Sequence, residues 1–346
     1  MKGFSALNIA VLAGGYSHER DVSLTSASLI ANALIDEGHK VCLCDVYLGH
    51  ELDEKDNLFT DEKRKIHKIE NSVPDLDSLK KESGNGDALI GKNVLDICRM
   101  ADVVFLALHG SMGENGQLQA TLDNFGIKYT GSGYVGSLLA MDKDISKKLF
   151  KFSGVVTPEW IRCDKDTSTD EIVEKIGFPC VVKPTSSGSS VGISLVSDRD
   201  GLDTALALAK KYEDSVIVEK QIIGREFTVG VLDGEVLPII EIIPTEGFYD
   251  YENKYQAGKT LEICPAEISE SLKARLSEQT LLAFDALRLS GYARFDFISD
   301  KDENTFCLEA NTLPGMTPTS LLPQMAAAIG ISYGNLCTKI IETALK

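Results

Sequence analysis

Two pairs of polar residues near the end of the chain have the spacing of a metal or phosphate site. Arg294 and Asp296 stand two residues apart in "YARFDF", and Glu309 and Asn311 stand two residues apart in "TFCLEAN". Side chains alternate between the two faces of a strand, so the members of each pair share a face. The turn-rich "SDKDEN" separates the two runs and predicts an antiparallel hairpin.

The apolar residues of this hairpin set its expected register. We expect one apolar face, and a slip of one residue would divide it between the two sides. Its members would be Phe295, Phe297, Phe306, Leu308 and Ala310. In this register the four polar residues share the other face, where three oxygen ligands and a guanidinium suit a hard cation such as Mg²⁺ that holds phosphates. The alternative is an ordinary solvated sheet face.

A second candidate site is the loop in "VVKPTSSGSSVGISLV", which predicts a strand, a loop rich in Ser and Gly, and another strand. Backbone N–H groups and hydroxyls of such a loop can close over phosphates. Lys183 at the end of the first strand favours that interpretation over an ordinary hairpin loop. No Gly-Lys-Ser/Thr opens a helix here, so the loop is not a Walker A motif.

Three further segments carry candidate residues with open alternatives. In "AGGYSHERDVS", Glu19 lies near a helix start, where it is either a ligand or a surface acid favoured by the helix dipole. His109 ends a buried strand at the edge where parallel sheets bind ligands, although a lone His can be structural. In "EGFYDYENKY" the aromatic residues around Lys254 suit a lid that excludes water, or a surface loop.

The elements that must position these residues begin with a strand, a helix and a strand. "LNIAVLAGG" predicts a buried strand and a glycine turn, "SLTSASLIANALIDEG" a helix that stops at Gly38, and "HKVCLCDV" a second strand. A further strand covers 101–110, so we expect a parallel α/β sheet. "GYVGSLLAMDKDISKKLFKFSG" predicts one helix, "GFPCVVKP" and "SVIVEKQI" predict a second sheet, and "LDGE" predicts a hairpin turn in a third unit.

Composition bounds the class of protein. The 346 residues suffice for two or three domains, and 43% of them are hydrophobic, as in globular proteins. A net charge of −17 disfavours nucleic acid as a partner. No apolar run is long enough to span a membrane, and the start lacks a signal-peptide pattern, so we expect a cytoplasmic protein. The eight scattered Cys predict buried free thiols, and the stretch 51–92 predicts a variable, solvated insertion.

Taken together, the motifs resemble the D-alanine–D-alanine ligases of the ATP-grasp group over nearly the whole chain. They are "GGYSHERDVS", "ALHGSMGENGQLQ", "AMDK", "VVKPTSSGSSVG", "EFTVGVL", "FYDYENKY", "ARFDF" and "LEANTLPGMTPTSLLP". The resemblance implies an α/β ATP-grasp fold of three domains: an N-terminal substrate-binding domain (1–131, with the insertion 51–92), a central ATP-grasp subdomain (132–219) and a C-terminal subdomain with the metal and catalytic residues (220–346). ATP would bind between the last two.

The resemblance also implies ATP-dependent ligation of two D-alanines to D-alanyl-D-alanine through an acyl phosphate, for peptidoglycan precursors. It suggests a homodimer. The nearest alternative is a ligase that takes D-serine or D-lactate second, and one of another class is an ATP-binding module without catalysis, although no metal or phosphate residue is missing. A nicotinamide dehydrogenase is disfavoured because the G-x-G-x-x-G fingerprint is absent.

Residue roles follow from the resemblance, position by position. The lysines on the phosphates would be Lys143, Lys183 and Lys254, under a loop that carries Ser189 and Ser190. Adenine and ribose would be held by Glu219, Lys220, Ile222 and Glu226. At Gln221, within this segment, some relatives have an aromatic residue, which leaves the packing of the adenine open.

The remaining roles concern the metal and the two amino acids. The resemblance implies two Mg²⁺ ions, with Mn²⁺ as an alternative, on Asp296, Glu309 and Asn311. The catalytic set would be Glu19, Ser189, Tyr255, Arg294 and the backbone of Gly315. The first D-alanine would meet Glu19 and His109, and the carboxylate of the second would meet the region of Ser320 and Leu321.

Overall fold

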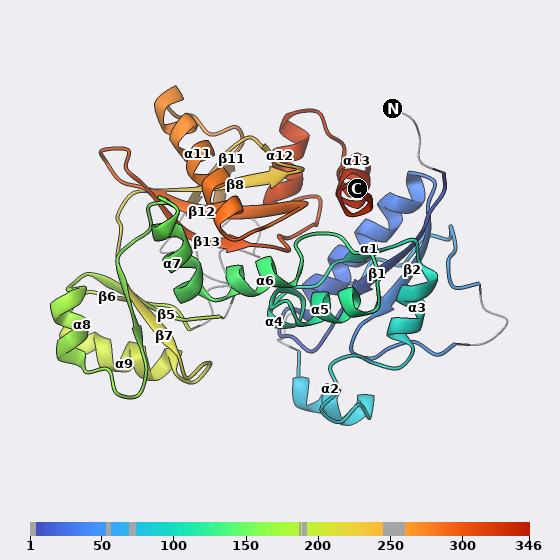
Figure 1. The fold of residues 1–346 in the computed structure, drawn as a ribbon, viewed down its shortest axis with the longest axis horizontal. Coiled ribbons are helices and arrows are strands. Elements are labelled where there is room, and N and C mark those ends of the chain that lie inside the picture. Colours follow the sequence, from blue (N-terminus) through green and yellow to red (C-terminus); the bar gives the residue numbers. More distant parts are fainter. Residues whose placement is uncertain (1–4, 53–56, 69–73, 187, 189–191, 245–259) are drawn as a thin grey trace.

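Three sheets follow one another along the chain in the computed structural model, within the residues that it describes: 5–52, 57–68, 74–186, 188, 192–244 and 260–346 (Figure 1). The predicted site residues Ser189, Ser190, Lys254 and Tyr255 lie outside these ranges.

The first sheet is parallel, as the sequence predicts. Its strands are β1 (Asn8–Ala13), β2 (Lys40–Asp45) and β3 (Val103–Leu106), in the order β2-β1-β3. Helix α1 (Arg20–Asp36) connects the first two, and the chain turns at Gly38 with a φ of 92°, which glycine adopts without steric cost. β1 is buried from Ile9 onward because parallel sheets are covered on both faces.

The predicted single helix over 133–154 is two helices. The helices between β2 and the second sheet are α2 (Leu76–Ser83), α3 (Val94–Met100), α4 (Ser111–Glu114), α5 (Gln117–Asn124), α6 (Tyr134–Met141) and α7 (Lys143–Phe152). Asp142 breaks the predicted helix: it has extended backbone and accepts a hydrogen bond from the Ile145 amide at 3.0 Å. The aspartate thus caps a new helix, and a period alone does not reveal this break.

The described part of the 51–92 insertion is largely exposed, as predicted, but residues 57–68 are also hydrogen-bonded to α1 and β2. Arg64 and Asn32 of α1 exchange two hydrogen bonds, of 2.7 and 2.9 Å, and the Arg64 guanidinium donates to the Val41 carbonyl at 2.6 Å. Thr60 forms an antiparallel bridge with Val41. These bonds fasten residues 57–68 to α1 and β2, which a count of charged residues cannot predict.

The second sheet is antiparallel, with strand order β4-β7-β5-β6. Its elements are β4 (Trp160–Cys163), α8 (Thr169–Lys175), β5 (Cys180–Pro184), β6 (Ser194–Val196), α9 (Arg199–Ala209) and β7 (Val216–Lys220). Helices α8 and α9 cover it through Ile172 and Leu202. β5 and β6 are the two strands predicted around the Ser- and Gly-rich loop, so that prediction is confirmed.

The third sheet has the order β11-β10-β8-β12-β13, and β9 pairs with β8. Its elements are β8 (Arg225–Leu232), β9 (Glu235–Val236), β10 (Ile240–Pro244), β11 (Thr260–Ile263), α11 (Glu270–Ala286), β12 (Tyr292–Ser299) and β13 (Thr305–Asn311). The predicted Asp-Gly turn joins β8 to β9, with positive φ at both Asp233 and Gly234, as a type I′ turn requires.

Packing crosses the predicted domain boundaries at both ends. Ala140 of α6 and Phe150 of α7 belong to the core of the third sheet. Of the last helices, α12 (Leu321–Ala328) packs against β8 of the third sheet, whereas α13 (Tyr333–Leu345) returns to the first sheet, where it lies beside α1 (Figure 1). The domain limits drawn from the sequence remain a prediction.

The hairpin of β12 and β13 confirms the predicted polar face and corrects the predicted apolar face. Asp296 pairs with Glu309, but Phe297 pairs with Cys307, because a β-bulge leaves Leu308 as the extra residue. The bulge changes the alternation, so Cys307 and not Leu308 joins the core. The prediction was therefore wrong for Leu308, and also for Phe306, which is only half-buried and outside that core.

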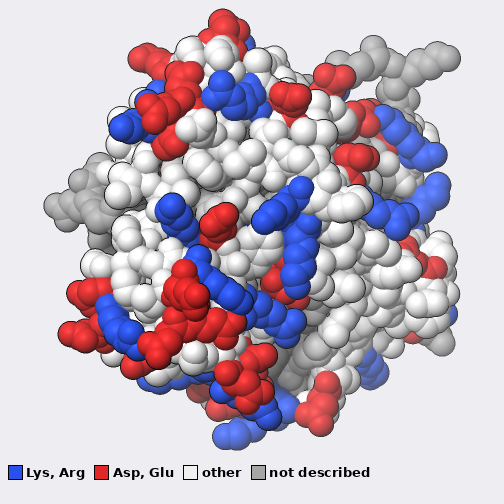
Figure 2. All heavy atoms as spheres, turned by 60° about the vertical axis from the view of Figure 1, so that its left-hand side comes forward, with Lys and Arg blue, Asp and Glu red and all other residues white. Residues whose placement is uncertain are grey.

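Acidic and basic side chains are interspersed over the face drawn in Figure 2. The net charge of −17 is thus not gathered there into one patch of a single sign. All eight Cys are free, and seven of them are buried, as the sequence predicts.

Candidate functional site

A cavity of about 730 Å³ lies between the second and third sheets. Apolar side chains from both sheets line it, among them Val181 and Leu195 from one side and Ile298 and Leu308 from the other. The bulge that removed Leu308 from the core places it here. Five residues predicted to hold adenine, ribose or phosphate line the same cavity: Lys183, Glu219, Lys220, Ile222 and Glu226. An apolar slot with a few convergent polar groups is the usual form of a small-molecule site.

A buried cluster of charges closes one end of this cavity. The Glu219 Oε1 atom lies 2.5 Å from Lys183 Nζ, and its Oε2 atom lies 2.8 Å from Lys147 Nζ. All three side chains are less than 10% exposed, and that of Lys147 is fully buried. Burial by itself would raise the pKa of Glu219, but the two ammonium groups outweigh it and lower that pKa, so the carboxylate is ionised.

The predicted metal ligands share one face of the β12–β13 hairpin, next to the cavity. Asp296 stands opposite Glu309, and Arg294 stands opposite Asn311. Asp296 accepts hydrogen bonds from Thr228 Oγ1 at 2.7 Å, from Arg294 Nε and Nη2 at 3.1 and 3.0 Å, and from Asn311 Nδ2 at 3.2 Å. These contacts hold the Asp296 carboxylate in place on this face.

The donor set fits a hard cation. Two carboxylates and one amide oxygen face the same side, and oxygen ligands of this kind suit Mg²⁺. Within the described residues no group of three His, Cys, Asp or Glu could hold a metal, so the set depends on the Asn311 amide.

Lys143 connects this face to the Ser- and Gly-rich loop. Its Nζ lies 3.3 Å from Glu309 Oε2, and its backbone amide donates to the Thr185 carbonyl at 2.9 Å, just after β5. The start of α7 is thus attached to the strand that leads into the loop. Lys143 and Lys183 both lie where the second sheet meets the third.

Glu19 and His109 come together at the carboxyl end of the first sheet. A Cβ placed on Gly110 would lie 3.1 Å from Glu19 Oε2, and one on Gly188 would lie 3.9 Å from the same atom. The Glu19 carboxylate is therefore next to both the His109–Gly110 turn and the Ser- and Gly-rich loop. Burial lowers the pKa of His109 although Glu19 raises it, and His109 Nε2 has no hydrogen-bond partner among the described residues.

Glu114 is a residue of this region that sequence reasoning missed. Its Oε2 accepts a hydrogen bond from the Gly110 amide at 2.8 Å. Burial, and then the Glu19 charge, raise the pKa of Glu114 to about 8. The signal available in the sequence was its position in "HGSMGENG", five residues after His109.

Ser320 and Gly315 lie together before α12. The Ser320 hydroxyl oxygen accepts a hydrogen bond from the Thr317 amide at 3.1 Å, and a Cβ on Gly315 would lie 3.0 Å from it. The Leu321 side chain is buried in a core cluster that is shared by the first and third sheets. Leu321 can therefore meet a ligand only through its backbone amide in the first turn of α12, where an anion is favoured.

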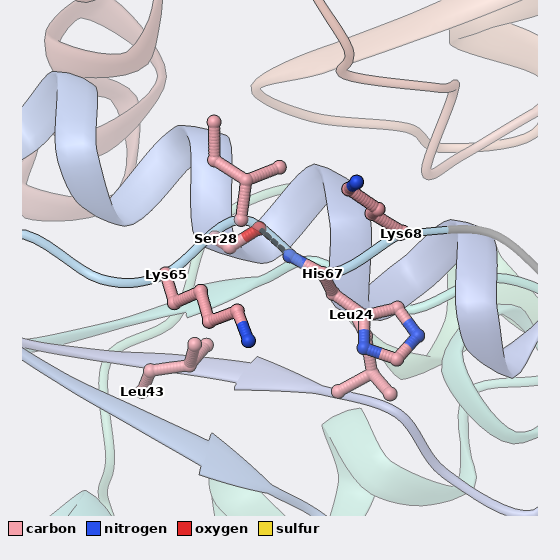
Figure 3. Close-up of a pocket in the computed structure, with 7 residues that line it drawn as sticks. Leu24, Ser28, Leu43, Lys65, His67 and Lys68 are labelled. Atoms are coloured by element: carbon pink, nitrogen blue, oxygen red, sulfur yellow. Dashed lines mark hydrogen bonds between the residues drawn. The ribbon is translucent and has the colours of Figure 1, made fainter.

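A second cavity, of about 510 Å³, contains none of the predicted site residues. It lies between α1, β2 and residues 65–68 (Figure 3). Leu24 and Leu43 form its apolar walls, and the Ser28 hydroxyl accepts a hydrogen bond from the His67 amide at 3.2 Å.

Among the described residues no helix is both long and apolar enough to cross a membrane.

Comparison with known proteins gives concordant matches over the whole chain. Residues 8–132 match the family model "D-ala D-ala ligase N-terminus", and residues 143–342 match "D-ala D-ala ligase C-terminus". The D-alanine–D-alanine ligase of Pediococcus pentosaceus is 43% identical over 344 residues, which cover 97% of both chains. That of Lacticaseibacillus casei is 39% identical over 345 residues, which cover 98% of this chain and 96% of the relative.

A solved structure agrees in fold. The crystal structure of the D-alanine–D-alanine ligase of Bacillus anthracis complexed with ATP superposes with a TM-score of 0.77 at 34% sequence identity, over 98% of each chain. The mixed architecture of one parallel and two antiparallel sheets is thus the ATP-grasp fold of these ligases.

Proposed function

This chain belongs to the D-alanine–D-alanine ligase family, and from that membership and the geometry of the site we propose how its residues join two D-alanines at the expense of ATP. It is an ATP-dependent ligase, and its product, D-alanyl-D-alanine, serves peptidoglycan synthesis.

ATP binds in the 730 Å³ cavity between the second and third sheets. The observation that carries this proposal is that five residues chosen from the sequence, spread from Lys183 to Glu226, line this one cavity. The adenine lies between the apolar walls formed by Val181 and Ile298, and Glu219 and Lys220 face its edge. Glu226, at the start of β8, binds the ribose hydroxyls.

The phosphates extend from the cavity toward the hairpin face. Lys143 and Lys183 neutralise them, and the Ser- and Gly-rich loop closes over them. Asp296, Glu309 and Asn311 hold Mg²⁺, which when bound supplies charge neutralisation and in-line positioning of the transferred phosphoryl group. The support for this placement is that two carboxylates and an amide share one strand face next to Lys143.

The reaction has two steps. A carboxylate oxygen of the first D-alanine attacks the γ-phosphorus, the bond to ADP breaks, and an acyl phosphate forms. The amine of the second D-alanine then attacks the acyl carbon, the C–O bond to phosphate breaks, and the ammonium proton is released. Arg294 and the Gly315 amide stabilise the negative oxygen of the tetrahedral intermediate.

The first D-alanine is held at the edge of the first sheet. Glu19 binds its ammonium group, and His109, neutral because burial lowers its pKa, lies near its carboxylate. The second D-alanine places its carboxylate on the Ser320 hydroxyl and the first amides of α12. The three sheets meet around this point, which excludes water from the acyl phosphate.

We also propose that the enzyme is a cytoplasmic homodimer. A cytoplasmic location is supported by its use of ATP. The dimer is supported by the family resemblance, and light scattering of the purified protein at several concentrations tests it.

The deciding experiment is a competition assay. Equal D-alanine, D-serine and D-lactate are offered with ATP and Mg²⁺, phosphate release is followed, and the products are separated by mass. We expect D-alanyl-D-alanine as the main product and no phosphate release without a D-amino acid. A mixed dipeptide as main product would identify D-serine as the second substrate, and a depsipeptide would identify D-lactate. No turnover at all would favour a non-catalytic ATP-binding module.

A further inference from the structure

Lys147 is a fully buried ammonium group that the proposed mechanism does not use. Its Nζ lies 2.8 Å from Glu219 Oε2, 2.7 Å from Thr157 Oγ1 and 3.4 Å from the Pro158 carbonyl. The Trp160 ring faces the same nitrogen, with its centroid at 5.5 Å. Four groups of the described chain therefore contact this nitrogen.

Lys183 is held much less firmly. Within the described residues the contact of its Nζ is with Glu219 Oε1, at 2.5 Å, and its side chain lines the ATP cavity. The two lysines thus use different oxygens of one carboxylate, but only Lys183 reaches the cavity. If either ammonium turns toward a ligand, it is that of Lys183.

The charge balance of the cluster decides whether that movement is possible. Burial lowers the pKa of Lys147, and the Glu219 carboxylate 2.8 Å away opposes that shift. With both lysines protonated, one carboxylate and two ammonium groups leave a net charge of +1 at the end of the cavity. If Lys183 were the only partner of Glu219, its departure would leave a buried carboxylate unpaired next to arriving phosphates, which is strongly unfavourable. With Lys147 in place, Glu219 keeps one cation throughout.

We infer that Lys147 is a positioning residue that keeps Glu219 neutralised, so that Lys183 can pass from Glu219 to the phosphates when ATP binds. The inference rests on the ATP site proposed above and adds a residue to it. Lys147 touches no part of ATP in this arrangement and acts only through Glu219. It therefore governs the affinity that the phosphates contribute. The affinity for the base is kept without Lys147, because the Glu219 carboxylate that faces the adenine then stays paired with Lys183.

The test compares two ligands that share the base and differ in the phosphates. Calorimetric titration gives the Kd of ATP, as its magnesium complex, and the Kd of adenosine for the wild type and for Lys147→Met. We expect the Kd of ATP to rise about 10- to 100-fold, because Lys183 is now needed by Glu219, while the Kd of adenosine changes less than about threefold. A parallel loss for both ligands would overturn the inference.

A double variant supplies the rescue. In the double variant Lys147→Met, Glu219→Gln the carboxylate is gone and Lys183 is released. The affinity for ATP divided by the affinity for adenosine should then return to within about threefold of the wild-type value. If this ratio stays as low as in Lys147→Met, the inference is wrong. The matched control is Lys148→Met, which removes the neighbouring exposed lysine and leaves both affinities unchanged.

Glu219→Gln alone keeps the inference testable if Lys147→Met does not fold. Lys183 then has no carboxylate to leave, so the affinity for ATP relative to adenosine stays at or above that of the wild type, and a fall would overturn the inference. The two proposals fail separately: a wild type that binds no ATP refutes the ATP site, whereas ATP binding that is insensitive to Lys147 refutes only the role of Lys147.

Discussion

Glu114 offers the clearest test of the electrostatics at the edge of the first sheet. Burial, and then repulsion from Glu19, raise its pKa from 4.5 to about 8, although the Gly110 amide lowers it. Below pH 4.5 the group is protonated in both the folded and the unfolded chain. Between these two values the fold keeps a proton that the unfolded chain has released, so stability falls as pH rises, and the loss is complete above about pH 8.

The magnitude follows from the width of that window. Each pH unit inside it removes at most about 1.4 kcal/mol of the free energy of unfolding. From about pH 5.5 to 7.5 the limit is about 2.7 kcal/mol, and because Glu114 keeps some contact with solvent we expect roughly 1–2 kcal/mol. For a chain of this size that corresponds to a fall in Tm of roughly 1–3 °C.

The assay is thermal unfolding of the wild type and of Glu114→Gln at a series of pH values. Gln has nearly the same shape, still accepts from the Gly110 amide, and does not titrate. The wild type should lose stability relative to the variant as pH rises through the window. Glu278→Gln, the same change at an exposed position of α11, is the control and should leave the pH curve unaltered. Parallel curves for wild type and Glu114→Gln, or a wild type that gains stability with pH, would refute the reasoning.

Three further changes probe the rest of the site. Arg294→Met should lower kcat by about 100- to 1000-fold and leave the Kd of ATP nearly unchanged, since the guanidinium serves the oxyanion; near-normal turnover would contradict that role. Glu309→Gln should abolish activity with little change in Tm, and a large fall in Tm with unaltered Mg²⁺ dependence would make the residue structural instead. Gly224→Ala should destabilise the fold by about 1–3 kcal/mol and weaken ATP binding, because its Cβ would lie 1.9 Å from the Ser299 carbonyl oxygen. Gly201→Ala, whose Cβ would have its nearest neighbour at 3.5 Å, is the matched control, and equal Tm values for the two variants would dismiss the clash.

The sequence by itself determined the local arrangements. Alternation along two short strands predicted that Asp296 and Glu309 share a face, and the structure places them opposite each other. A glycine stop ended α1, and the Asp-Gly pair formed the predicted turn. These features depend on neighbours within a few residues, and local steric rules suffice for them.

Bulges and caps were the first features that the sequence did not reveal. The extra residue in β13 moved Leu308 from the expected core to the wall of the cavity. Asp142 divided one predicted helix into two by accepting a backbone hydrogen bond. Both depend on a balance between local hydrogen bonds and the packing of the whole sheet, which a periodic pattern does not contain.

Only the tertiary structure decided how the charges are paired and buried. Lys147 and Glu219 are far apart along the chain, yet they meet because α7 packs where the second sheet approaches the third. Glu114 has a raised pKa because distant segments bury it and because Glu19, from the loop after β1, lies near it. Desolvation and charge pairing depend on which distant segments bury a group. The type and spacing of residues in the sequence do not tell which segments those are.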